Sequence, residues 1–361
     1  MRRIVMEQRN DTAQLLDLMA RPAFCVTDGK ISRVNAQAAA YHIAPGTEIS
    51  ALLLTGGEEY AAFDGGCLHL TLELAGERLG ASVTRLAEFD VFCLEELADS
   101  RELQAMALAA RELRDPLTTV MITAQRLYPV EGKQDDSATR EQVARLNRGL
   151  FQIQRVIGNM SDAGHYAVSP TRLETCNVVG ILDEIFAKAA ALTEHAGIRL
   201  DYRSHPEAVY GLADRESLER AVLNMVSNAV KFSAPDSVIR AKLTRRGQKL
   251  YLSLENSGEP IPAGTLSDVF TRYQRQCGME DSRFGIGLGL VLIRAAAAAH
   301  GGTVLMESRE SGTRITMSLA IRQGDARMRS GQMAVDYAGE MDHSLIELSD
   351  VLPPSLYEKE F

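Results

Sequence analysis

The chain has 361 residues, 45% of them hydrophobic and 24% charged, and its formal net charge is −9. This length and composition predict a globular protein of two or three domains. The negative charge, without an evident cluster of Lys and Arg, argues against nucleic acid as the main partner. No apolar run is long enough to span a bilayer and the first residues are too charged for a signal peptide, so we expect a cytoplasmic protein.

The cysteines are odd in number, widely spaced and without metal-ligand spacing, which predicts reduced thiols rather than disulfides. A redox or flavin role for one of them is the alternative. They are Cys25, Cys67, Cys93, Cys176 and Cys277.

The N-terminal part predicts a small α+β domain over residues 14–97. Two short strands, 23–26 and 30–34, flank an Asp28-Gly29 turn, and Asn35 is placed to cap the helix that follows. With Gly29, Ile31 and Asn35, this order resembles that of PAS sensor domains. The resemblance implies a sensor whose ligand no residue identifies, and a plain α+β domain is the alternative.

Residues 98–166 predict a helical hairpin. Apolar residues or alanines recur every three or four positions from Leu103 to Leu127 and again from Val143 to Met160, with a turn-rich stretch at 129–137 between them. One hairpin cannot bury both stripes, so we expect a homodimer with a four-helix bundle.

Residues 175–322 predict an α/β sandwich, with alternating strand patterns near 239–243, 250–254 and 315–321 and helices at 215–232 and 290–300. The last residues, 323–361, form an acidic extension. They predict either a segment that docks or recruits a partner, or a disordered tail.

Two patterns in the sandwich point to a nucleotide. Glycines at every second position over 285–289 lead directly into a helix, which suits a phosphate, although such runs also form ordinary turns. Asn224, Asn228 and Lys231 share one helical face, where amide oxygens could bind Mg²⁺. Asparagines satisfied by neighbouring backbone are the alternative.

Four segments, 224–233, 255–262, 269–273 and 285–290, resemble in order and spacing the N, G1, F and G2 boxes of histidine-kinase catalytic domains. The resemblance implies ATP and Mg²⁺ as ligands, with Asn224 and Asn228 at Mg²⁺ and the phosphates, Lys231 at a phosphate and Phe232 beside the adenine. The site residues that it implies in the other boxes are Asn256, Gly258, Ile261, Phe270, Arg272, Tyr273, Gly285, Gly287, Leu288 and Gly289.

Two positions depart from the family pattern. Asn256 replaces the adenine-reading Asp, but an amide oxygen also accepts a hydrogen bond from the adenine amino group. Pro260 replaces the second G1 glycine, removing an N–H group and fixing φ, which could weaken binding. Residues 271–284, with their three arginines, would form a lid over the phosphates.

The first helix of the hairpin carries a sequence, 110–118, that resembles the H box of the same family. Arg111 stands where the phosphoacceptor histidine is expected, and a guanidinium group has no lone pair with which to attack a phosphate. Glu112, the family's base, is present, whereas Asp115 replaces the residue that positions water for dephosphorylation. His165 is the one histidine near the hairpin that could substitute.

The sequence therefore favours an ATP·Mg²⁺-binding pseudokinase of the two-component family, acting as a dimeric regulator with a response regulator or another signalling protein as partner. Two alternatives remain. One is an active kinase that phosphorylates a separate protein, and the other is an interaction module without nucleotide binding, which Pro260 and Asn256 suggest.

Overall fold

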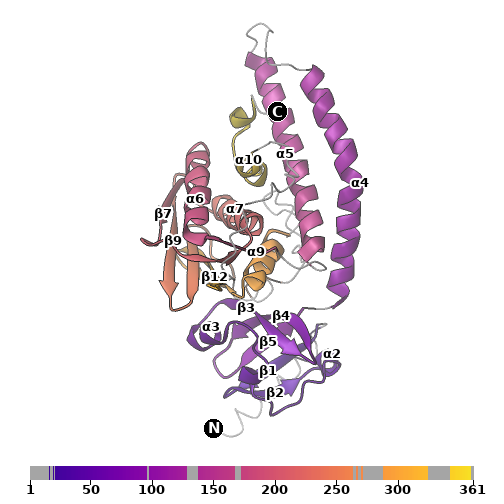
Figure 1. Cartoon of the computed structure of the whole chain (residues 1–361), viewed down its shortest axis with the longest axis vertical. Coiled ribbons are helices and arrows are strands. Elements are labelled where there is room, and N and C mark those ends of the chain that lie inside the picture. The colour runs from indigo at the N-terminus through magenta and orange to yellow at the C-terminus, as the bar shows by residue number, and fades with distance from the viewer. Residues whose placement is uncertain are drawn as a thin grey trace.

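The computed structural model describes residues 21–95, 97–127, 137–166, 172–262, 288–323 and 342–358, together with Leu16, Met19, Leu266 and Phe270. A small sheet-rich region lies at one end of the molecule, and two long helices run side by side away from it (Figure 1). A larger sheet with helices on one face lies beside the two long helices. The described part of the C-terminal extension lies between those helices and the larger sheet.

The N-terminal region is an antiparallel sheet around its own apolar core. The predicted turn at Asp28 and Gly29 is confirmed, because both residues have positive φ. Asn35 caps α2 by accepting from the Ala38 N–H at 2.9 Å, and it also accepts from the Ala23 N–H at 3.0 Å. The elements are β1 Ala23–Thr27, β2 Lys30–Val34, α2 Ala36–Ala39, η1 Ile49–Ala51, α3 Gly57–Ala62, β3 Cys67–Leu74, β4 Glu77–Arg85 and β5 Asp90–Leu94.

Two long helices, α4 (Leu97–Leu127) and α5 (Ser137–Tyr166), follow and pack against each other. Only part of the predicted apolar stripe is buried in this contact, where Met121 and Ala124 of α4 meet Leu150 of α5. Other apolar side chains of the two helices remain exposed, as expected of helices whose apolar faces are not all covered within one chain. They are Leu108, Leu113, Val120, Ile122, Leu146, Ile153 and Val156.

The C-terminal sheet has its helices on one face, as the sequence predicts. Ile239, Ala241 and Leu243 of β9 point into the core, while the residues between them face the open side. The core also takes up the apolar faces of the helices. The elements are β6 Glu174–Asn177, α6 Val178–Glu194, β7 Arg199–Arg203, β8 Tyr210–Ala213, α7 Arg215–Lys231, β9 Val238–Arg246, β10 Lys249–Asn256, α9 Leu288–Ala299, β11 Val304–Arg309 and β12 Gly312–Ala320.

The two sheet regions join into one ten-stranded sheet, ordered β2-β1-β5-β4-β3-β11-β12-β10-β9-β7. The junction is the antiparallel pairing of β3 with β11, in which Leu68 lies opposite Leu305. The sequence did not predict this junction, because its patterns identify strands but not the edges that meet.

The C-terminal extension is folded over residues 342–358 and packs on the chain itself, so this stretch is not a disordered tail. It contains α10 (His343–Glu347) and the short helix η2 (Pro354–Tyr357). Leu345, Leu348 and Tyr357 are buried in the same core cluster as α7, and the Tyr357 ring meets Phe151 of α5 edge-on at 5.1 Å.

Four of the cysteines lie in the described residues, and all four are free thiols, whereas Cys277 lies outside them. Burial raises the pKa of Cys25 to about 11, which keeps this thiol protonated and unreactive at neutral pH. Among the helices that the structure describes, none combines the length and apolar character needed to cross a bilayer.

Candidate nucleotide site

The predicted N-box residues lie on α7, which begins at the cap Asp214 and ends at Lys231. Asn224 is fully buried, whereas Asn228 and Lys231 are partly exposed. The start of α9 crosses this face closely, since a Cβ at Gly289 would lie 2.9 Å from Asn224 Oδ1. The structure thus brings the predicted N and G2 positions together, and glycine at 289 leaves room for the asparagines.

The predicted adenine side is built from the end of β10 and the end of α7. Asn256 donates from its side-chain nitrogen to the Phe232 carbonyl oxygen at 3.0 Å, which leaves its amide oxygen as the acceptor for a ligand. A Cβ at Gly258 would overlap the same carbonyl oxygen, so only glycine fits this turn. Beside it, the Ile261 N–H donates to Ser308 Oγ at 2.7 Å, and Phe270 is buried.

Several predicted positions lie outside the described residues. They are Arg272, Tyr273, Gly285, Gly287 and the rest of the lid at 271–284. Leu288 and Gly289 form the first turn of α9.

Arg111 and Glu112 are both exposed on α4, and Pro116 lies within that helix. The side chain of His165 is not among those described. The segment 110–118 is therefore helical, and the side chains of Arg111 and Glu112 are accessible on it.

A buried charge network surrounds Asn224, and sequence reasoning missed it. Glu347 of α10 is 1% exposed and accepts from Asn224 Nδ2 at 3.2 Å. Its carboxylate also lies 3.5 Å from Arg155 Nε and 3.3 Å from Arg220 Nη2. Arg155 in turn donates to Asn224 Oδ1 at 3.2 Å.

The two arginines of this network are 6% and 2% exposed and come from α5 and α7 respectively. Arg220 also pairs with Asp162 of α5 and donates to Asn159 Oδ1 at 3.2 Å. Because buried charges must be paired, these contacts fix α5, α7 and α10 relative to one another.

Asp350 extends the network to the outer end of α7. Its carboxylate lies 2.7 Å from Lys231 Nζ and also pairs with Arg155. Burial alone would raise the pKa of Asp350, but Arg155 and Lys231 outweigh it and hold the pKa below the usual value of 3.8. Asp350 is thus ionised at neutral pH.

The sequence contains one signal for this network. Glu347 lies within the apolar run Leu345 to Leu348, and Arg155 lies between Ile153 and Ile157 of the predicted seam. A charge among apolar residues indicates a buried pair, but spacing alone does not show which charges meet.

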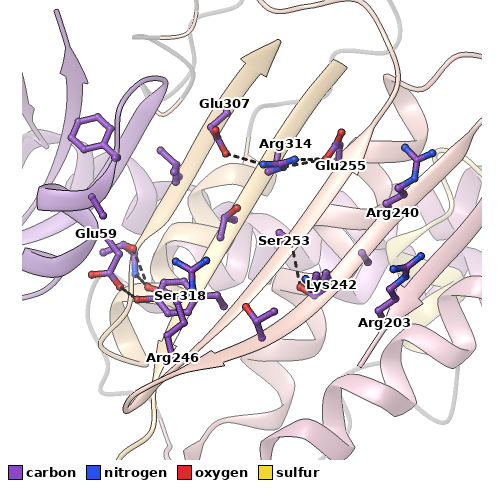
Figure 2. A pocket seen from close by; sticks show the side chains of 18 of the residues that line it. Glu59, Arg203, Arg240, Lys242, Arg246, Ser253, Glu255, Glu307, Arg314 and Ser318 are labelled. Atoms are coloured by element: carbon purple, nitrogen blue, oxygen red, sulfur yellow. Dashed lines mark hydrogen bonds and ion pairs between the residues drawn. The ribbon is translucent and has the colours of Figure 1, made fainter. Parts of the chain in front are cut away.

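A hollow of about 700 Å³ lies on the open face of the sheet, away from α7. Figure 2 shows its charged side chains, several of which bind one another. Arg314 pairs with Glu255 at 2.6 Å, and Lys249 pairs with Glu59 of α3 at 2.7 Å. None of the predicted ATP-binding residues that the structure describes lines this hollow.

The comparisons with known proteins agree with an ATPase domain of the histidine-kinase type. Residues 213–323 match the family of histidine kinase-, DNA gyrase B- and HSP90-like ATPases. The sensor protein KdpD of Mycobacterium tuberculosis is 27% identical over 219 residues, which are 58% of this chain and 25% of that protein. The histidine-protein kinase/phosphatase MprB of Mycolicibacterium vanbaalenii is 28% identical over 237 residues, which are 64% and 48% of the two chains.

Among solved structures, full-length ShkA in complex with AMPPNP matches with a TM-score of 0.50 at 19% identity, over 61% of this chain and 46% of that chain. This likeness concerns the fold. The chain spans at most about half the length of the two curated relatives described above.

The helix-covered sheet and the α7 face that meets the start of α9 thus belong to an ATPase domain of the histidine-kinase type. The chain that carries this domain is homologous to sensor histidine kinases.

Proposed function

We propose that this protein is an ATP·Mg²⁺-binding regulator of the two-component type that does not phosphorylate itself at the H box. The observation that carries the proposal is the face of α7 on which Asn224 and Asn228 lie beside Gly289 and Lys231 is partly exposed, in a chain with Arg111 at the expected acceptor position. These side chains fit the proposed ligands, because amide and phosphate oxygens bind Mg²⁺ and an ammonium group binds a phosphate.

When bound, Mg²⁺ would neutralise the phosphate charge. Asn228 and Asn224 would supply protein oxygens to the ion, and Lys231 would hold a phosphate oxygen. Asn256 would accept from the adenine amino group, in an orientation that its bond to the Phe232 carbonyl supports. Gly258 lets this turn approach the end of α7.

Arg111 at the position of the expected acceptor disfavours phosphate transfer to it. Phosphate transfer to a side chain needs a lone pair on the attacking atom, and the guanidinium group stays protonated and has none. Glu112 beside it is exposed and would have no acceptor to activate. ATP would therefore act as a bound ligand that selects a conformation.

We further propose that residues 14–97 form a PAS-like sensor domain and that the α4–α5 hairpin forms a homodimer. The antiparallel strand pairing and the separate apolar core of the N-terminal region support the first point. The exposed apolar residues of α4 and α5 support the second, because a second copy could cover them. The partner would be a response regulator or another signalling protein.

Dimerisation can be tested with Val120→Glu in α4, which is 52% exposed in the stripe. A charge in a buried bundle seam is costly, so we expect the variant to be a monomer by light scattering and the unmodified protein to be a dimer. Leu54→Glu, at a 39% exposed position outside the helices, is the matched control and should stay dimeric. If the unmodified protein is monomeric at all concentrations, the proposed homodimer is contradicted.

ATP binding can be tested by calorimetric titration of ATP·Mg²⁺ into the protein and into Asn228→Ala. We expect at least about a tenfold loss of affinity in the variant, since one Mg²⁺ ligand is removed. Asn228→Asp, which keeps an oxygen ligand, should retain more affinity than Asn228→Ala. Equal affinities in all three proteins would place the nucleotide elsewhere.

A second candidate function is an interaction module that binds no nucleotide. Two contacts favour it: Asn224 binds Glu347, and Lys231 binds Asp350. These carboxylates therefore already bind two of the residues that are predicted to bind ATP. Absence of ATP·Mg²⁺ binding in every variant of the carboxylates would establish this alternative.

A further inference from the structure

We propose that the C-terminal segment 342–358 is a tethered acidic competitor of the nucleotide's phosphates, so that ATP·Mg²⁺ and the docked segment exclude each other. The inference rests on the proposed function, since it assumes that α7 binds ATP·Mg²⁺. It adds that a segment of the same chain binds the side chains that would bind ATP·Mg²⁺. The segment could thereby regulate the site.

The first argument is the identity of the contacted residues. Glu347 accepts from Asn224 at 3.2 Å, and Asp350 binds Lys231 at 2.7 Å. These two residues of α7 are the ones that would meet Mg²⁺ and a phosphate. A side chain that is bonded to a carboxylate of the segment is not available to a nucleotide in the same arrangement.

The second argument is the chemistry of the side chains that the segment contacts. Two arginines, a lysine and an asparagine amide converge from α5 and α7. Guanidinium and ammonium groups bind carboxylates and phosphates alike. These groups can thus bind a polyanion, and in this structure the carboxylates beside them are Glu347 and Asp350 of the segment and Asp162 of α5.

Electrostatics make simultaneous occupancy unfavourable. A triphosphate would bring more negative charge beside two carboxylates, one of which is almost fully buried. Like charges at such short range repel strongly where water is excluded. The nucleotide would therefore have to displace the segment before it could reach Asn224 and Lys231.

The rest of the segment is built to dock firmly. Arg148 of α5 donates to the Ser349 carbonyl oxygen at 2.9 Å and to that of Asp350 at 3.0 Å. Asn147 donates to the Tyr357 carbonyl oxygen at 2.9 Å. These contacts tie the segment to α5, and the carboxylates tie it to α7.

Displacement would have a structural consequence beyond the site. Arg155 and Arg220 connect α5 to α7 partly through Glu347. If nucleotide removed Glu347, this part of the link between the ATPase domain and the helical hairpin would be lost, and only the direct contacts between α5 and α7, such as those of Arg155 with Asn224 and of Arg220 with Asp162, would remain. Bound ATP would then be reported to the hairpin without any phosphate transfer.

The test is the affinity of ATP·Mg²⁺ for the full chain, Asp350→Asn and the double variant Glu347→Gln with Asp350→Asn. We expect affinity to rise at least about tenfold in the double variant and by less in the single one. Glu358→Gln removes one charge from the end of the same segment and should leave affinity unchanged. Asp350 lies nearer the surface than Glu347, so the single variant remains informative if the double variant does not fold.

Hydrogen exchange of the same full-length protein gives a second readout. On addition of ATP·Mg²⁺, the backbone amides of 345–352 should exchange faster, because the segment leaves its site. If all variants bind ATP·Mg²⁺ with equal affinity and hydrogen exchange does not change, the proposal that the segment competes with the nucleotide is overturned. Binding in none of them would overturn the proposed nucleotide site itself.

Discussion

At the scale of single residues, close contacts explain why glycine is required at two positions of the nucleotide site. Gly289 allows α9 to begin against Asn224. Gly258 allows the turn after β10 to meet the carbonyl of Phe232, to which Asn256 also donates. Each of these glycines sets the distance between two backbone segments rather than supplying flexibility.

Gly258→Ala tests this account. The added Cβ would overlap the Phe232 carbonyl oxygen and lie 3.0 Å from its carbonyl carbon, so the backbone must shift. We expect a loss of about 1–3 kcal/mol in the free energy of unfolding, measured by urea titration, and weaker ATP binding. Gly57→Ala is the control, because nothing lies within 4 Å of its Cβ. Equal stability of the two variants would contradict the close contact.

At the scale of elements, His300 connects the end of α9 to the start of α7. Its Nε2 accepts from the Asp214 N–H at 3.0 Å, and its Nδ1 lies 2.7 Å from the Ala296 carbonyl oxygen. This pattern requires the neutral ring with the proton on Nδ1. Asp214 is also the cap of α7, so one neutral imidazole helps to position both helices of the site.

The pKa of His300 gives a prediction for stability. Burial lowers this pKa below the usual 6.5, although the bond to Ala296 opposes the shift. A lowered pKa means that the unfolded chain binds the proton more readily. The stabilisation is therefore complete above pH 6.5 and is lost as the pH falls below it towards the folded-state pKa.

We expect the free energy of unfolding to fall between about pH 7 and pH 5.5, and to fall less in His300→Gln. Glutamine offers an oxygen to the same N–H group but does not titrate. Urea unfolding of both proteins at the two pH values measures the difference. Parallel losses in the two proteins would show that other groups cause the pH dependence.

At the scale of the whole molecule, the joined sheet couples the N-terminal region to the ATPase domain. Besides the β3–β11 pairing, Glu95 lies 2.5 Å from the buried Arg294 of α9 and 3.3 Å from His69 of β3. Glu59 of α3 binds Lys249 of β10 at 2.7 Å. We therefore expect a change in the N-terminal region to reach α9, whose first turn belongs to the candidate nucleotide site, through these direct contacts.

Gly66→Ala tests this coupling. Gly66 has φ of +90°, and a Cβ there would overlap the carbonyl oxygen of Met306 in β11. We expect the unmodified protein to unfold in one calorimetric transition and Gly66→Ala to unfold in two, because the two regions of the variant would no longer unfold together. Gly65→Ala meets nothing within 4 Å and should keep one transition. A single transition in Gly66→Ala would argue against coupling at this junction.

The sequence predicts local elements of this fold better than their long-range contacts. The turn at Asp28 and the cap Asn35 follow from local chemistry and are confirmed, and the helix predicted over 215–232 is observed one residue shorter, as Arg215–Lys231. The sheet junction and the pairing of Glu347 with Arg220 were not predicted. These contacts join positions far apart in the chain, and local patterns do not encode their partners. The roles of the site residues in binding ATP remain predictions.

The central claim is that the protein binds ATP without phosphorylating itself, and the most direct measurement is incubation with γ-labelled ATP and Mg²⁺. The labelled chain would be separated on a gel and tested for stability to acid and alkali. The account predicts no covalent label in a preparation that binds ATP, because Arg111 has no lone pair to attack the phosphate. Label on this chain that survives alkali but not acid would reveal a phosphohistidine and contradict it.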